Sequence, residues 1–177
     1  DAADDQKIAH TNSYPFRQHS YSMWWDSEGE SDRLISLEGD VAWDSNGAHP
    51  NSSTKALLWD RQSDRQAALS DIFSNASAFA AQTRKAYCKA LDAERARRRE
   101  GEKLEGEFAQ CPVYRELAIL LVDRNHDHRF DHILFVAPPY VAGPYVEGEY
   151  EISLPVTASL VAAMKPGYRS SFQPQRQ

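Results

Sequence analysis

The stretch from Asn75 to Arg99 constrains the fold more than any other part of this sequence. No proline or glycine interrupts it before Gly101, and apolar side chains recur along it at steps of three and four residues. This period predicts an amphipathic helix with one buried stripe, and Ser74 is a suitable N-cap. The expected stripe consists of Ile72, Ala76, Phe79, Ala80, Thr83, Tyr87, Ala90 and Leu91.

The sequence before this helix has the alternating period of strands. Residues 19–26 alternate Tyr21, Met23 and Trp25 with other side chains, and a glycine-containing turn follows at 27–32. The segment 33–43 completes a predicted hairpin, and residues 54–60 form a third strand. Gly39 is a candidate β-bulge within the hairpin. The residues expected on one face of the second strand are Ile35, Leu37, Val41 and Trp43.

The sequence after the helix predicts a second hairpin and a last strand. The apolar runs at 117–122 and 132–136 flank a polar connector, and residues 145–154 alternate apolar and acidic side chains. Pro155 is expected to open a short C-terminal helix. We therefore predict an α+β fold, a largely antiparallel sheet of about six strands with one long helix and a short C-terminal helix packed on it.

Composition narrows the domain organisation and the classes of partner. The polar residues 1–18 are expected to form an N-terminal arm, and residues 19–177 a single domain. The 26 acids and 20 bases give a net charge of −6, which argues against nucleic-acid binding. No apolar stretch approaches the roughly 18 residues of a membrane span, so any membrane association is expected to be peripheral.

The two cysteines, Cys88 and Cys111, give information about the cellular compartment of the protein. An even pair in an exported chain indicates one disulfide, and closing such a loop contributes about 3 kcal/mol in the chain-entropy model. The alternative is two free thiols in a cytosolic protein. The small, acidic start of the chain, DAADDQK, is typical of a stretch that follows an export signal or a lipid anchor.

Three segments together resemble one known family. They are GAHPN at 47–51, LSDIF at 69–73, and VAPPYVAGPYVEGEYEISLP at 136–155. In this order they resemble the extracytoplasmic domain of unknown function of RsiV-like anti-sigma factors, which PdaC-type deacetylases carry as a non-catalytic module. The hairpin at 19–43 resembles the partner domain found upstream. The resemblance implies a binding module of the periplasm or the extracellular face, with lysozyme as the ligand of the RsiV-like receptors.

The resemblance and the residue chemistry together select a set of candidate binding residues. Pro50 biases His49 towards extended backbone, and Gly47 permits a bend that a side chain would forbid. Tyr140 matches the aromatic of the family's tyrosine motif, which here reads PPY. Exposed tyrosines on a loop stiffened by proline suit protein interfaces and sugar stacking. The candidates for ligand contact are His49, Asn51, Tyr140 and Tyr145, with Gly47, Pro50, Gly143 and Pro144 as structural loop residues.

The segment HDHRFDH at 126–132 is the strongest enzymatic signal. Its histidine spacing is one residue longer than that of a metallohydrolase string. The same region resembles a calcium loop, but His128 stands where glycine is usual and Leu134 where a bidentate glutamate is usual. A plain turn, a calcium loop and a transition-metal site are therefore all open. The candidate ligands are Asp123, Asn125, His126, Asp127, His128 and Asp131.

Three functional hypotheses follow from these patterns. The first is a non-enzymatic cell-envelope module that binds lysozyme, another envelope protein or a peptidoglycan-type glycan, without a cofactor. The second is a metal-dependent hydrolase centred on residues 123–132. The third is a structural accessory protein without a small ligand. No GxSxG, GxGxxG, HExxH or phosphate-binding loop is present in the sequence.

Overall fold

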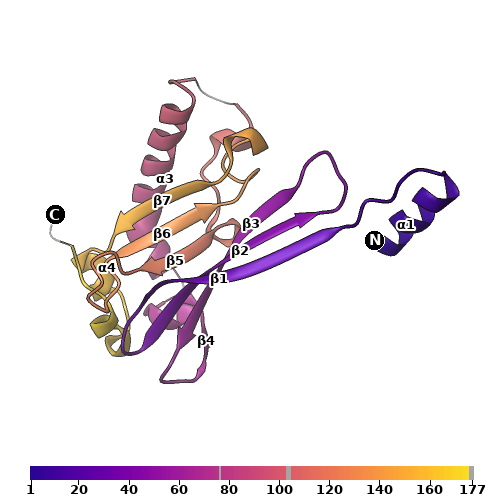
Figure 1. Ribbon diagram of the computed structural model, residues 1–177. Coiled ribbons are helices and arrows are strands. Elements are labelled where there is room, and N and C mark those ends of the chain that lie inside the picture. The colour runs from indigo at the N-terminus through magenta and orange to yellow at the C-terminus, as the bar shows by residue number, and fades with distance from the viewer. Residues whose placement is uncertain (76, 103–104, 176–177) are drawn as a thin grey trace.

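The computed structural model describes residues 1–75, 77–102 and 105–175. These residues form seven strands in two antiparallel sheets (Figure 1), which confirms the α+β class. The expected single sheet of about six strands is wrong, because the first four strands pair among themselves and the last three form a second sheet. The first sheet contains β1 (Ser20–Glu30), β2 (Leu34–Asp44), β3 (Asn51–Asp60) and β4 (Arg65–Ala67). The second contains β5 (Ala118–Val122), β6 (His132–Ala137) and β7 (Tyr150–Pro155).

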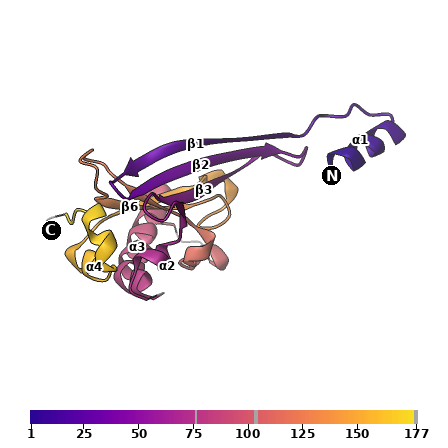
Figure 2. The same cartoon turned by 90° about the horizontal axis from the view of Figure 1, so that it is seen from below.

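The long helix α3 (Ala78–Arg98) packs on the second sheet and closes the main core (Figures 1 and 2). It starts three residues later than predicted, after Ser77, and Ser74 instead donates its hydroxyl to the Ala163 carbonyl. Ala76, part of the predicted stripe, lies outside the described residues. The fully buried side chains of this core include Ile72, Phe73, Tyr87, Leu91, Phe130, Phe135, Tyr150 and Leu160.

The short C-terminal helix α4 (Ala158–Ala162) begins after Thr157, whose hydroxyl accepts from the Leu160 amide at 3.1 Å. Pro155 does not open it, since this proline is the last residue of β7. Another short helix, α2 (Leu69–Ile72), precedes α3. Short 3-10 helices occupy Glu107–Ala109, Tyr114–Glu116, Tyr145–Glu147 and Pro166–Ser171.

The predicted β1–β2 hairpin forms, but its bulge is not at Gly39. Gly39 pairs regularly with Trp25 and Lys55, whereas the register shifts in β1 between Ser27 and Gly29. The glycine has a packing role instead, because a Cβ there would lie 2.7 Å from the Trp25 ring. The predicted face of Ile35, Leu37, Val41 and Trp43 shares its side of the sheet with Tyr21, Met23 and Trp25.

The opposite face of the first sheet contacts the rest of the molecule. Leu34 is fully buried in the main core, and the Ser36 hydroxyl accepts from the Leu121 amide at 3.1 Å. Figure 2 shows the helices on this side of the first sheet and none on its other side. The aromatic face of β1 and β2 is therefore turned away from the body.

The predicted N-terminal arm is largely helical. It contains the helix α1 (Ala2–Thr11), which Asp1 caps by accepting from the Ala3 and Asp4 amides. The arm extends from the start of β1 away from both sheets (Figure 1). Among the described residues, no helix has the length and apolar composition of a membrane span.

Candidate functional site

Two loops that are far apart in the sequence meet at one end of the fold. His49 precedes β3, while Tyr140 and Tyr145 lie between β6 and β7. The imidazole of His49 stacks on the Tyr145 ring with 3.7 Å between ring centroids, and its Nε2 lies 3.0 Å from the Tyr140 hydroxyl. Tyr145 completes the contact by donating its hydroxyl to the Pro50 carbonyl at 2.7 Å. We call His49, Tyr140 and Tyr145 the aromatic rim.

The hydrogen bonds of the rim select one tautomer of the His49 ring. His49 Nδ1 lies 2.8 Å from the Pro50 carbonyl oxygen, which can only accept, so Nδ1 carries a proton. In the neutral ring Nε2 then accepts from the Tyr140 hydroxyl. The Tyr140 ring remains 54% exposed, and its backbone is left-handed with φ 71°, held by the bond from its amide to the Gly143 carbonyl. Such a conformation in a non-glycine residue costs about 1–2 kcal/mol and is common at binding sites.

The loop that carries both tyrosines is held in place by its contacts with Glu147 and Tyr150. A Cβ on Gly143 would lie 3.0 Å from the Tyr150 ring and would collide with the Glu147 carboxylate, so this position requires glycine for space. Pro144 precedes the turn that presents Tyr145. Glu147 pairs with Arg99 at 2.8 Å and accepts from the buried Tyr150 hydroxyl. The Arg99 hydrogen bond holds the pKa of Glu147 below its usual range.

The last turns of α3 supply the cations that hold this loop. Arg98 donates to the Glu147 and Glu149 carbonyls, each at 2.7 Å, and its guanidinium lies 4.0 Å from the Tyr150 ring centroid. Arg95 is 4% exposed and donates to the Ala142 carbonyl at 2.9 Å. These roles are not visible in the sequence, where the arginines are indistinguishable from a solvated helix end.

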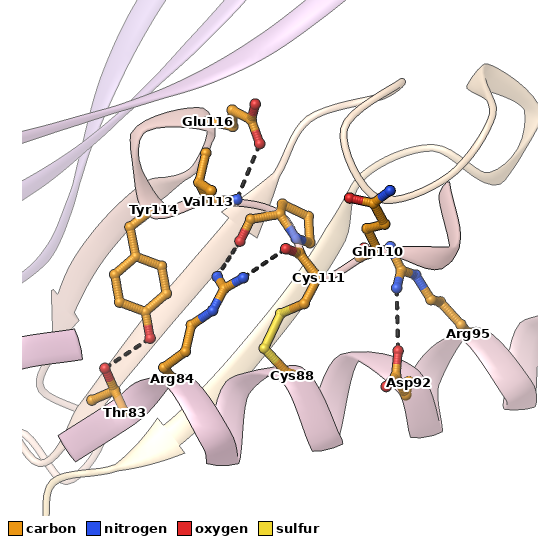
Figure 3. Close-up of a disulfide and its surroundings, with 11 residues drawn as sticks. Thr83, Arg84, Cys88, Asp92, Arg95, Gln110, Cys111, Val113, Tyr114 and Glu116 are labelled. Carbon is orange, nitrogen blue, oxygen red and sulfur yellow. Dashed lines mark hydrogen bonds and ion pairs between the residues drawn. A yellow bond between two sulfur atoms is a disulfide. The ribbon is translucent and has the colours of Figure 1, made fainter. Parts of the chain in front are cut away.

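A disulfide anchors the segment on the other side of the loop. Cys88 of α3 and Cys111 are bonded, as the cysteine count predicts, and the arginines before and after Cys88 hold the same segment (Figure 3). Arg84 donates to the Cys111 and Pro112 carbonyls, and Arg95 to the Gln110 carbonyl. The covalent bond and these hydrogen bonds leave residues 110–112 little freedom to move.

A cleft of about 400 Å³ opens beside the rim, between the two sheets. Trp24 and Tyr145 contribute aromatic surface to it, and Asp40 and Glu149 contribute carboxylates. Burial raises the pKa of Glu149, although the Thr54 hydroxyl donates to it at 3.1 Å. Further along the same face, burial and the nearby Glu28 raise the pKa of Glu38 to about 7. The cleft therefore combines aromatic rings with carboxylates that form no salt bridge among the described residues.

The other predicted loop residues have different positions. Asn51 begins β3, where it pairs with Trp43, and the structure does not bring its side chain into the rim. The expected role of Gly47 is wrong, since a Cβ there would meet nothing within 4 Å. Asn46 takes the left-handed conformation of this loop instead, with φ 62°. Pro50 contributes through its carbonyl, which accepts from both His49 and Tyr145.

The histidine-rich segment forms a turn whose polar groups largely bond to one another. The Asp123 carboxylate accepts from the amides of Asp127 and His128, and Asp131 accepts from the Arg124 amide. His126 and His128 both have left-handed backbone, and the side chain of His128 is 72% exposed. Asn125 bonds to Gln173. Across the described residues, no three His, Cys, Asp or Glu side chains are arranged to hold a metal ion.

Comparison with solved structures identifies proteins of the same fold. The chain aligns over 98% of its length with 72% of a DUF3298 family protein from Pseudomonas aeruginosa, with a TM-score of 0.60 and 16% identity. It aligns over 96% of its length with 63% of a DUF3298 member from Bacteroides fragilis, with a TM-score of 0.61 and 18% identity. No protein-family model matches the chain, and no curated protein matches it. The fold is thus that of DUF3298 proteins, and the chain spans less than two thirds of the second structure.

Proposed function

We propose that the protein is a non-enzymatic binding module of the cell envelope, and that it binds lysozyme or a peptidoglycan-type glycan through the aromatic rim. The observation that carries this proposal is the stacking of His49 on Tyr145 beside the exposed Tyr140. The resemblance to RsiV-like domains also selects Tyr140, which matches the aromatic residue of the family's tyrosine motif. The DUF3298 fold is compatible with that likeness.

The rigidity of the rim supports binding. Residues on mobile loops lose conformational entropy when a ligand orders them, at about 0.5–1.5 kcal/mol for each immobilised side chain. Here the tyrosine loop is tied to α3 by Arg98 and Arg99, and His49 is held through the Pro50 carbonyl. Aromatic rings fixed in this way present contact area at low entropic cost.

The charge of the molecule favours a basic protein as the ligand. The net charge is −6, and Asp40 and Glu149 line the cleft next to Tyr145. Complementary charge accelerates encounter with a cationic partner such as lysozyme. The disulfide supports export to an oxidising compartment, the periplasm or the outer face of the cell.

Calorimetry with lysozyme and with muropeptides tests the proposal. We expect binding of at least one of them, and Tyr140→Ala should weaken it by at least 2 kcal/mol, roughly the threshold of an interface hot spot. The matched control is Tyr14→Ala, because Tyr14 is 51% exposed but lies on the arm. Absence of heat with both ligands, or equal losses in the two variants, would reject this function.

A further inference from the structure

The strand β1 has a free edge that includes none of the three residues of the aromatic rim. It is the outermost strand of the first sheet and pairs with β2 alone within that sheet. Among the described residues, the backbone of Ser20–Ser27 forms no hydrogen bond outside the β1–β2 ladder. Alternate amides and carbonyls along this edge therefore have no protein partner. The edge meets the body at Glu28 and Gly29, where the Asp123 amide donates to the Glu28 carbonyl and Gly29 packs against Asp123.

Soluble proteins normally protect such an edge. The usual devices are short length, charged side chains or proline on the strand, a bulge, or a covering helix or loop. β1 is 11 residues long and contains no proline or lysine, and its charged residues are confined to its second half, where Asp26, Glu28 and Glu30 lie. Its bulge lies beyond Ser27, at the end that already contacts the body. The arm leaves in line with the strand and does not fold back over the edge (Figure 1).

Large apolar side chains are concentrated along the same free edge. Tyr21 is 66% exposed, Trp24 50% and Trp25 41%. Tyr21 and Trp25 share the face turned away from the body, and Trp24 occupies the other face. Exposed aromatic residues on both faces of an unpaired strand are typical of an interface rather than of a free surface.

The charges along the chain favour an antiparallel copy of the same strand. Arg17 precedes β1 and is exposed, whereas Asp26, Glu28 and Glu30 occupy its second half. An antiparallel arrangement brings the arginine of each chain beside the acidic end of the other. A parallel arrangement would align the acidic ends and repel. Neither Arg17 nor Asp26 has an ion-pair partner within the described part of the chain.

We propose that the free edge of β1 pairs antiparallel with β1 of a second copy of this chain, with Met23 at the two-fold axis. An axis perpendicular to the sheet keeps each face on its own side, so residues must oppose residues of the same face. Centring on Met23 overlaps the unobstructed stretch and places Tyr21 opposite Trp25 of the second copy, twice by symmetry. Aromatic pairs of this kind stabilise antiparallel strands. The two four-stranded sheets become one continuous sheet.

Cross-linking tests the register. Both native cysteines are in the disulfide, so Met23→Cys introduces the only free thiol. We expect a short bifunctional thiol reagent to convert this variant to a covalent dimer. Ser63→Cys, in the exposed turn between β3 and β4, is the control and should remain monomeric. Equal cross-linking of the two variants, or none at Met23→Cys, overturns the proposed pairing.

Sedimentation equilibrium tests the association itself without a cysteine. Wild-type protein is expected to show twice the monomer mass at high concentration, and Tyr21→Lys/Trp25→Lys to show only the monomer mass. Tyr14→Lys/Val146→Lys makes the same change of charge at two other exposed apolar residues and should still dimerise. Circular dichroism verifies that each variant is folded. A monomeric wild type, or a dimeric edge variant, overturns the proposed pairing. Neither result tests the binding of lysozyme by the rim, which calorimetry tests separately.

Discussion

At the scale of single residues, Asp60 joins the first sheet to the C-terminal segment. Its side chain is completely buried at the end of β3, and it accepts from the Arg33 guanidinium, the Tyr168 hydroxyl and the Gln62 amide. Arg33 also lies 3.7 Å from the centroid of the Tyr168 ring. The Arg33 hydrogen bond holds the pKa of Asp60 well below its usual range, against the effect of burial.

Replacing Asp60 should therefore be among the most damaging single changes. We expect Asp60→Ala to lower the free energy of unfolding by about 3 kcal/mol, because it leaves the partly buried Arg33 guanidinium without its counter-charge and the buried Tyr168 hydroxyl without its acceptor. Urea denaturation measures this loss. Arg97→Ala breaks an exposed pair with Glu94 and should lose only about 0.3–0.5 kcal/mol. Similar losses in both variants would contradict a special role for Asp60.

Glu38 has the opposite effect on stability. Burial raises its pKa to about 7, and the charges of Glu28, Asp40 and Glu151 add to the shift. The folded state therefore retains a proton that the unfolded chain has already lost at neutral pH. Stability from this group is present below the unfolded pKa of about 4.5 and is lost as the pH rises towards 7.

Glu38→Gln removes this pH dependence. The variant should be more stable than wild type above neutral pH, by on the order of 1 kcal/mol once solvent screening is allowed for. At about pH 5 the two proteins should differ little. Thermal melts over this range measure the difference. A constant offset at every pH would mean that the charge of Glu38 is not its cause.

At the scale of elements, the spacing of apolar residues predicts strands and helices, but it does not predict which strands pair in the same sheet. Residues 33–43 alternate strongly, yet their most apolar face is the one turned away from the body. The alternation of apolar and polar residues along a strand indicates that one face is apolar, but it does not indicate which other element covers that face. The division into two sheets depends on contacts between distant segments, such as Ser36 with Leu121, which no local pattern encodes.

The candidate site was predictable only in part, for the same reason. The turn residues around His49 and Tyr140 are visible in the sequence, but 91 residues separate the two rings that the fold brings together. The residue types also predict a structural role for both Gly47 and Gly143. Of these two glycines, only Gly143 has other atoms close to the position that a Cβ would occupy.

These two glycines form a matched pair for mutagenesis. Gly143→Ala should lower the free energy of unfolding by about 1–3 kcal/mol, because the new methyl group collides with Glu147 and crowds Tyr150. Gly47→Ala should be neutral or stabilise by about 0.4–1 kcal/mol, since the methyl group meets no atom and reduces the freedom of the unfolded chain. Chemical denaturation of both variants checks the contrast, and equal effects would refute it.

At the scale of the whole molecule, the arm has fewer contacts with the body than the parts of the body have with one another. Leu34 and Ser36 connect the first sheet to the main core and to β5, and Asp60 connects it to the C-terminal segment. The arm is stabilised mainly by its own helix α1 and by the contact of the Asp5 carboxylate with His19 Nε2 at 2.9 Å. Among the described residues, a single hydrogen bond joins residues 1–18 to the first sheet's loops, from the side-chain Nδ2 of Asn46 to the Arg17 carbonyl at 2.6 Å.

Deleting residues 1–18 should consequently leave a folded body. We expect the melting temperature to change by no more than about 2–4 °C, the equivalent of 1 kcal/mol for a chain of this size. The near-ultraviolet circular dichroism of the buried aromatic core should be unchanged. The melts are best recorded at low protein concentration, so that pairing through β1 does not contribute. A larger fall, or loss of a cooperative transition, would show that the arm is an integral part of the domain rather than an extension of it.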